Sequence, residues 1–258
     1  MTPSTMARRM SSIHRPAYGS ESRRVYYGLV NRWPLFAIAW AAALAGFVLL
    51  SILAAVSDKF PGDVWLAHRI QEIDVPSFAR ALDWVEHSAG VTEVILVCAV
   101  AVAALLLVRD AAGAIILPVI VSARVLITWA LKELIERPRP SAALVHFENQ
   151  PSTFSFPSGH AMGAFVLYGL LLYFAQLHIS DGRIRLPVQA ACVAIIVLTG
   201  IERVYAGHHW PSDVVGGYYA SALIVGAVIA AHQLVWRHTS NLRSNWSFSR
   251  SAAVTNLE

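Results

Sequence analysis

Charged residues are scarce in this sequence, and that scarcity limits the kind of protein it encodes. Asp, Glu, Lys and Arg make up 14% of the 258 residues, whereas soluble domains carry roughly 25%. Hydrophobic residues make up 56%, and the mean hydropathy is +0.53. A soluble protein of this length would not need several separate apolar runs of bilayer length. The composition therefore indicates an integral membrane protein.

Cysteine is also scarce: the chain has two, Cys98 and Cys192, and both fall within apolar runs. At such positions cysteine usually packs as a small apolar side chain, so neither a disulfide framework nor a cysteine metal site is indicated. The net charge of +4 lies mostly in short segments that flank the apolar runs. That placement reports membrane orientation and does not indicate a nucleic-acid partner.

About six apolar runs approach the roughly 20 residues that cross the hydrocarbon core. The fold class that they predict is all-α, a six-helix transmembrane bundle over residues 35–236. The expected spans are Leu35–Val56, Val91–Val108, Ala111–Leu131, Ala161–Ile179, Pro187–Ile201 and Val215–Trp236. The polar terminal segments, residues 1–34 and 237–258, are expected to be cytoplasmic and disordered.

Two features depart from plain apolar spans. The third predicted span contains Arg124, which is costly in hydrocarbon unless it faces other helices or water, so we treat it as a functional candidate. Residues 57–90, between the first two spans, mix apolar and charged residues at near-helical spacing. This pattern predicts an extramembrane helical segment that either lies in the membrane interface or is a plain packing element; the sequence does not decide between them.

The distribution of Lys and Arg predicts the orientation of the chain. Taken together, four segments carry more basic than acidic residues: the N-terminal segment, the turn at Arg109, the loop with Arg183 and Arg185, and the C-terminal tail. Because cytoplasmic loops are enriched in Lys and Arg, both termini are expected in the cytoplasm. The expected membrane is a bacterial inner membrane. A cleaved signal peptide in place of the first span is disfavoured, since the run is longer than a typical signal core.

Two clusters of polar residues lie at the outer ends of the predicted spans. In one, Lys132 ends a helix and Arg139 follows in a proline-stiffened turn, so the two cations could hold an anion. Basic residues also commonly lie at membrane-helix ends without a ligand. In the other, Ser158, Gly159 and His160 precede the fourth span. Ser158 can cap that helix, Gly159 allows close approach to a phosphate, and His160 could donate a proton to a leaving oxygen.

A third cluster surrounds the start of the sixth span and contains Arg203, His208, His209 and Asp213. Asp213 lies four residues after His209, a spacing at which a carboxylate can hold one ring nitrogen and make the other more basic. His208 is adjacent and equally basic, but it lacks this spacing. On the predicted topology all three clusters lie on the same side of the membrane, so they can converge.

The three clusters resemble the type 2 phosphatidic acid phosphatase superfamily, which also includes the vanadium haloperoxidases. That family's pattern is Lys, six residues, Arg-Pro; then Pro-Ser-Gly-His; then Ser-Arg, five residues, His, three residues, Asp. The matching residues here are Lys132, Arg139, Pro140, Pro157, Ser158, Gly159, His160, Arg203, His209 and Asp213. One position departs, because Glu202 stands where the family has serine. A carboxylate would repel phosphate, so we expect Glu202 to point aside and pair with Arg203 or Arg124.

The resemblance implies a metal-independent phosphatase with a phosphohistidine intermediate. It assigns His209, oriented by Asp213, as the nucleophile, and His160 as the acid that protonates the leaving group and then activates water. The groups expected to bind phosphate are Lys132, Arg139, Ser158, Gly159 and Arg203. Three cationic side chains would do the work of a divalent ion, so no metal or other cofactor is expected.

The expected substrate follows from the position of the site at the membrane–water boundary, where lipid head groups lie. We predict hydrolysis of a lipid phosphate or diphosphate, of the phosphatidic acid, phosphatidylglycerol phosphate or polyprenyl diphosphate type. The bilayer and the lipid are the expected partners, and no obligate protein partner is evident. A lipid phosphotransferase with the same phosphohistidine, or a non-catalytic lipid or anion carrier, are the alternatives; a carrier would have no need for the pairing of His209 with Asp213.

Overall fold

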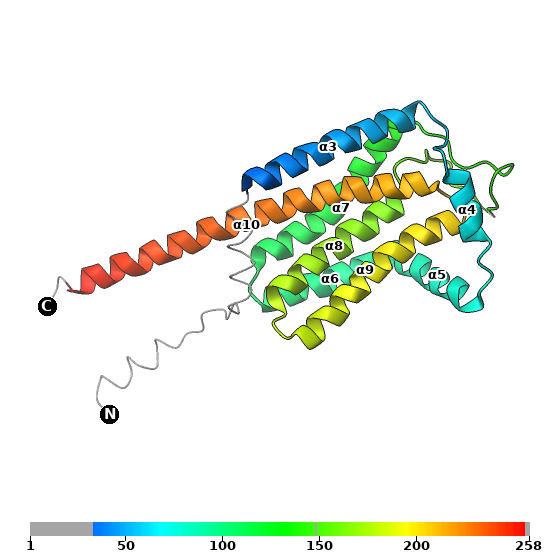
Figure 1. Ribbon diagram of the computed structural model, residues 1–258. Helices are drawn as coiled ribbons and strands as arrows, with labels where there is room; N and C mark the ends of the chain where they lie inside the picture. Colours follow the sequence, from blue (N-terminus) through cyan, green and yellow to red (C-terminus); the bar gives the residue numbers. More distant parts are fainter. Residues whose placement is uncertain (1–32, 148, 256–258) are drawn as a thin grey trace.

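The computed structural model describes residues 33–147 and 149–255, and every regular element in these ranges is an α-helix (Figure 1). In chain order the helices are α3 (Trp33–Ala55), α4 (Asp63–Gln71), α5 (Pro76–Ser88), α6 (Val91–Leu107), α7 (Ala111–Ile135), α8 (Gly159–His178), α9 (Gly182–Tyr205) and α10 (Pro211–Thr255). The six longer helices lie side by side, with α8 packed against α7, α9 and α10, while α4 and α5 lie at one end of the bundle.

The membrane spans agree with the prediction of a six-helix all-α bundle, with one span less regular than the others. In the described part of the chain, α3, α7, α8, α9 and α10 as far as Val235 are long and apolar enough to cross a membrane. Helix α6 has 17 residues, a length of about 26 Å. It completes a sixth span only together with α5, from which it is bent by 70°.

Large apolar side chains point outward from the bundle. Leu107 is 85% exposed, Leu134 79% and Leu126 70%. Exposed apolar surface of this extent is unfavourable in water and is typical of a face that contacts lipid. The outward face therefore agrees with a multi-pass membrane protein.

Polar residues next to the helices fix where several of them begin. The side chains of Asp110, Ser158 and Asp181 each accept a hydrogen bond from a first-turn backbone N–H, of α7, α8 and α9 respectively. Such caps satisfy donors that the helix itself leaves free. Helix α9 therefore starts earlier than the predicted span at Pro187–Ile201, and it continues to Tyr205.

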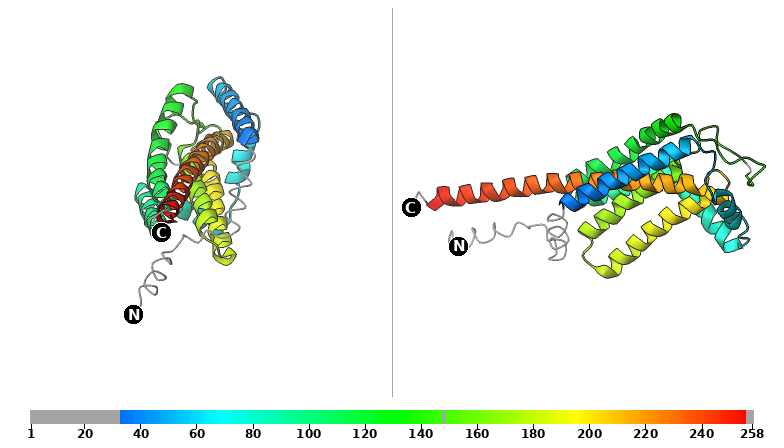
Figure 2. Two further views of the ribbon diagram at one scale, coloured as in Figure 1. Left: turned by 90° about the vertical axis from the view of Figure 1, so that its left-hand side faces the viewer. Right: turned by 45° about the horizontal axis from the view of Figure 1, so that its top comes forward.

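The C-terminal segment differs from the expectation of disorder. Helix α10 continues through Thr255, so most of the segment 237–258 is helical and extends beyond the end of the bundle (Figure 2). The expectation for residues 1–34 falls almost entirely outside the described residues, which begin at Trp33 in α3.

Helices α4 and α5 occupy the predicted helical segment between the first two spans, and both pack against α9. Asp63, at the start of α4, is 3% exposed, whereas Trp65 and Trp84 face outward. Glu86 of α5 forms an ion pair with Arg203 of α9 at 3.0 Å. The buried Asp63 and the Glu86–Arg203 ion pair fit a packing element, while the exposed Trp65 and Trp84 fit a helix at the membrane interface, so both alternatives remain open.

A buried polar cluster joins three helices at the opposite end of the bundle. Asp110, at the start of α7, lies 2.9 Å from Nε2 of His178 and 3.3 Å from Nε2 of His232. Nδ1 of His232 lies 3.0 Å from the Tyr173 hydroxyl. The cluster therefore fixes α7, α8 and α10 relative to one another at the end of the bundle that lies away from the candidate site.

Candidate active site

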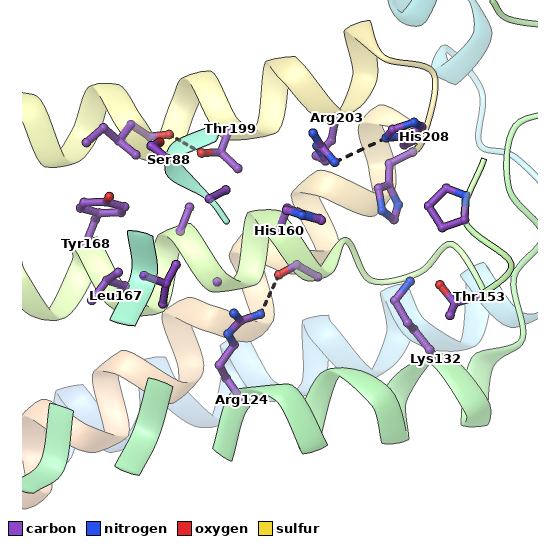
Figure 3. A pocket seen from close by; sticks show the side chains of 18 of the residues that line it. Ser88, Arg124, Lys132, Thr153, His160, Leu167, Tyr168, Thr199, Arg203 and His208 are labelled. Carbon is purple, nitrogen blue, oxygen red and sulfur yellow. Dashed lines mark hydrogen bonds between the residues drawn. The ribbon is translucent and has the colours of Figure 1, made fainter. Parts of the chain in front are cut away.

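A cavity of about 330 Å³ lies among α7, α8, α9 and the loops that connect them (Figure 3). Six of the eight site residues expected from the sequence line it: Lys132, Arg139, Gly159, His160, Arg203 and His209. Asp213 lies behind His209, and Ser158 does not line the cavity. The three sequence clusters therefore converge at one end of the bundle, as their order along the spans predicts.

His209 is 3% exposed and lies between the carboxylate of Asp213 and the guanidinium of Arg139. Its Nδ1 is 3.5 Å from Oδ2 of Asp213, and its Nε2 is 3.3 Å from Nη1 of Arg139. Because Arg139 is a donor only, Nε2 carries the lone pair in this geometry and Nδ1 carries the proton. Burial lowers the pKa of His209 to about 4, with Arg139 and Lys132 also lowering it and Asp213 opposing them. The ring is therefore neutral near pH 7, which is the form that can attack phosphorus.

Asp213 is fully buried and is held by four donors besides His209. One oxygen accepts hydrogen bonds from the Ser155 hydroxyl and from the Trp210 backbone N–H at 2.8 Å. The other accepts from Nη1 of Arg137 at 2.6 Å, and the Asp213 carbonyl accepts from the backbone N–H of Ser158 at 3.0 Å. A carboxylate held by three donors besides His209 cannot rotate freely, so the orientation of His209 is fixed by the loops around it.

Arg137 is the centre of a buried charge network that the sequence analysis did not assign. Its guanidinium is 1% exposed, with Nη2 3.2 Å from Asp63 Oδ2 and the group stacked 4.5 Å from the centre of the Phe60 ring. Asp63 also accepts hydrogen bonds from the backbone N–H and hydroxyl of Ser212 at 3.0 and 2.7 Å. The network therefore connects α4 to the start of α10, where Asp213 lies.

Lys132 and Arg139 are fixed by the loop that precedes α8. The Lys132 ammonium donates to the carbonyls of Phe154 and Ser155. Arg139 donates to the carbonyl of Thr153 at 2.7 Å and to that of His208 at 2.6 Å. Among the described residues neither cation forms an ion pair with a carboxylate, although the charge of Asp213 is close enough to act on both. An anionic ligand therefore has no paired carboxylate to displace from Lys132 or Arg139.

Arg203 is more heavily compensated than the other two cations. Its Nε donates to Glu202, its Nη2 donates to Glu86, and its Nη1 lies 3.4 Å from Nδ1 of His208. Glu202 therefore points aside and pairs with Arg203, one of its two expected partners, rather than with Arg124. A phosphate that binds Arg203 must share it with two carboxylates, which weakens its contribution relative to Lys132 and Arg139.

Ser158 and Gly159 have different roles in the structure. Ser158 is fully buried: its hydroxyl accepts from the Ala161 N–H at 3.5 Å, and its own N–H is used by Asp213. The Ser158 O–H has no acceptor among these contacts, but the side chain does not line the cavity, so its expected phosphate-binding role stays a prediction. Gly159 does line the cavity, and a Cβ there would lie 3.3 Å from Cγ2 of Thr128. Absence of a side chain lets α8 approach α7 closely at the cavity wall.

Comparisons with known proteins agree with the motifs. Residues 111–237, which contain every site residue expected from the sequence, match the PAP2 superfamily. Phosphatidylglycerophosphatase B of Bacillus subtilis is 43% identical over 101 residues, 38% of this chain and 48% of the relative. Lipid A 4'-phosphatase of Rhizobium leguminosarum is 33% identical over 117 residues, 41% of this chain and 48% of the relative. The chain thus spans about half the length of these curated relatives.

The fold has a solved counterpart as well. The crystal structure described as the first transmembrane PAP2 type phosphatidylglycerolphosphate phosphatase, from Bacillus subtilis, is similar with a TM-score of 0.64 and 27% identity. The match covers 76% of this chain and 96% of the solved one. The solved structure thus agrees with this chain in the arrangement of the helices, as the family match does in the motifs. Through residues 111–237, the chain belongs to the PAP2 superfamily that its motifs resemble.

Proposed function

We propose that the chain is a membrane phosphatase that hydrolyses a lipid phosphate or diphosphate through a phosphohistidine on His209. The observation that carries the proposal is the placement of His209, with Nδ1 facing Asp213 and Nε2 at the edge of a cavity lined by Lys132 and Arg139. A group that only binds anions has no need of an oriented, neutral imidazole. The similar proteins are described as phosphatases of lipid phosphates.

The proposed reaction uses the side chains in sequence. Lys132, Arg139 and Arg203 bind the phosphoryl oxygens and stabilise the charge of the transition state. Nε2 of His209 attacks phosphorus in line while the bond to the leaving oxygen breaks, and His160 supplies the proton to that oxygen. His160 then takes a proton from water as the water oxygen attacks phosphorus. The bond between phosphorus and Nε2 of His209 breaks, and inorganic phosphate is released.

The proposed orientation puts the active site on the extracytoplasmic side of a bacterial inner membrane and both termini in the cytoplasm. It rests on Arg109, Arg183 and Arg185, which lie at the bundle end away from the cavity (Figure 1), since such residues favour the cytoplasmic side. The bacterial origin of the similar proteins supports the choice of membrane. Labelling of single cysteines at each end in sealed cells would test it.

The test of the function is phosphate release by the purified protein in mixed micelles. We expect release from at least one of phosphatidic acid, phosphatidylglycerol phosphate and farnesyl diphosphate, and a trapped phosphoenzyme that is labile in acid and stable in alkali. Substrate consumption that requires an added acceptor lipid, with the phosphate recovered on that lipid instead of as free phosphate, would support the phosphotransferase. Binding of all three lipids without any release would support the carrier and contradict the proposal.

Removal of divalent metal is expected to leave turnover nearly unchanged. Lys132, Arg139 and Arg203 already supply the positive charge at the phosphate, and they would repel a divalent cation from the same volume. We expect excess EDTA to change the rate by less than about twofold, while vanadate, which adopts the geometry of phosphorus during transfer, inhibits. A loss of more than about tenfold with EDTA, restored by Mg²⁺, would contradict this mechanism.

A further inference from the structure

Arg124 lies within the membrane-spanning part of α7 and lines the same cavity as the candidate catalytic residues (Figure 3). It precedes Lys132 by eight residues, or about 12 Å along the helix axis. The cavity continues past Arg124 to Leu167, Tyr168 and Ile195. Arg124 is therefore positioned between the proposed phosphate site and the more apolar end of the cavity.

The charge of Arg124 has no counterion in the structure. Across residues 33–147 and 149–255, no carboxylate lies within 4.0 Å of it, and Glu202, an expected partner, pairs with Arg203. The buried Nε has no hydrogen-bond partner, and Nη1 donates to the Gly159 carbonyl at 3.2 Å. That carbonyl can also accept from the residue 163 N–H by helical geometry, so Arg124 is not needed to satisfy it. An uncompensated arginine at this depth points to an anionic ligand.

The opposite wall of the cavity leaves room for the guanidinium. A Cβ at Gly163 would lie 2.8 Å from Cζ of Arg124, so any larger residue would displace the group. Tyr168 adds a hydroxyl to the same cavity, whereas the Thr199 hydroxyl donates to the Ile195 carbonyl at 2.7 Å. This part of the cavity thus combines the Arg124 cation and a tyrosine hydroxyl with apolar side chains, a lining suited to the polar linker of a lipid.

We propose that Arg124 binds a second phosphate of the substrate, one that lies between the scissile phosphate and the lipid chain. The inference rests on the proposed function and narrows its substrate class to lipids with two phosphates. A guanidinium binds phosphate oxygens through two parallel N–H groups. The second phosphate is either the inner phosphate of a diphosphate or a phosphodiester joined to the scissile group through glycerol, and both present the same anionic oxygens.

The experiment compares kcat/KM for three substrates: phosphatidylglycerol phosphate, farnesyl diphosphate and phosphatidic acid. Wild-type protein is expected to prefer at least one of the first two over phosphatidic acid by about tenfold or more. Arg124→Gln is expected to lower kcat/KM for the preferred substrate by about 10- to 100-fold, mainly through KM. Its effect on phosphatidic acid should be much smaller. A loss for phosphatidylglycerol phosphate would identify the second phosphate as the phosphodiester. A loss for farnesyl diphosphate would identify it as the inner phosphate of a diphosphate.

Two variants serve as controls. Arg183→Gln removes an exposed arginine at the far end of α9 and should leave all three substrates unaffected. Arg124→Lys keeps the positive charge but lacks the two parallel N–H groups of the guanidinium, so it should lose part of the preference for two-phosphate lipids. If Arg124→Gln does not fold, Arg124→Lys tests the inference in its place. Equal turnover of one- and two-phosphate lipids by wild type, or equal losses for all substrates in the Arg124 variants, would overturn the inference. No phosphate release from any lipid by wild type would instead contradict the proposed function itself.

Discussion

His209→Ala is expected to abolish phosphate release, with a loss of about 1,000-fold or more. The variant removes the only atom that we place to attack phosphorus, Nε2, and leaves Lys132 and Arg139 able to bind the substrate. The purified variant should therefore retain lipid binding while no phosphoenzyme is trapped from a labelled substrate. Both measurements are needed, because retained binding separates a lost nucleophile from a collapsed cavity.

His208→Ala is the matched control, since it removes a neighbouring imidazole of the same cavity. Its Nδ1 lies 3.4 Å from Arg203 and has no contact with Asp213. Its backbone carbonyl, which accepts from Arg139, is retained in the variant. We expect activity to stay within about tenfold of wild type, with a normal phosphoenzyme. Loss of the phosphoenzyme in His208→Ala but not in His209→Ala would reverse the assignment of the nucleophile.

The membrane spans could be predicted from the sequence because the thickness of the bilayer sets the minimum length of an apolar run that can cross it. The runs before Val56 and after Val215 reach it, and they correspond to α3 and α10. The bend between α5 and α6 was not predicted, because it depends on how α5 packs against α9. Helicity past Trp236 was also missed, since a polar sequence gives no periodic signal that distinguishes a helix from a disordered tail.

The candidate site could be predicted where two residues that contact each other lie close together in the sequence, at the start of one helix. His209 and Asp213 are four residues apart, and the structure brings their side chains together at 3.5 Å. Ser155 and Asp63 had no comparable signal: they reach Asp213 and Arg137 across 58 and 74 residues of sequence. A loop serine and an acid in a polar segment resemble any solvated residue until the chain is folded. The role of Ser158 stays a prediction: its motif is present, while its hydroxyl accepts from the Ala161 N–H and its backbone N–H donates to the Asp213 carbonyl.

Arg137→Met is expected to give the second-largest loss, although Arg137 does not line the cavity. Removing it leaves Asp213 and Asp63 buried without their shared cation, and breaking a buried ion pair typically costs about 3–5 kcal/mol. A displaced Asp213 no longer holds His209, so phosphoenzyme formation should fall by about 100-fold or more. Because the cations of the cavity remain, kcat should fall far more than KM rises. Single-turnover kinetics and thermal unfolding of the same preparation measure the two effects.

Asp63→Asn is the matched control for Arg137→Met, because it weakens the same network from the side away from His209. The contact between Arg137 and Asp213 at 2.6 Å is retained, and asparagine can still accept a hydrogen bond from Ser212. We expect a measurable loss of thermal stability with kcat within about tenfold of wild type. If both variants lost the same share of activity, the network would act only through global stability. If Arg137→Met kept normal phosphoenzyme formation, the orientation of His209 would have to depend on Ser155 and Trp210 instead.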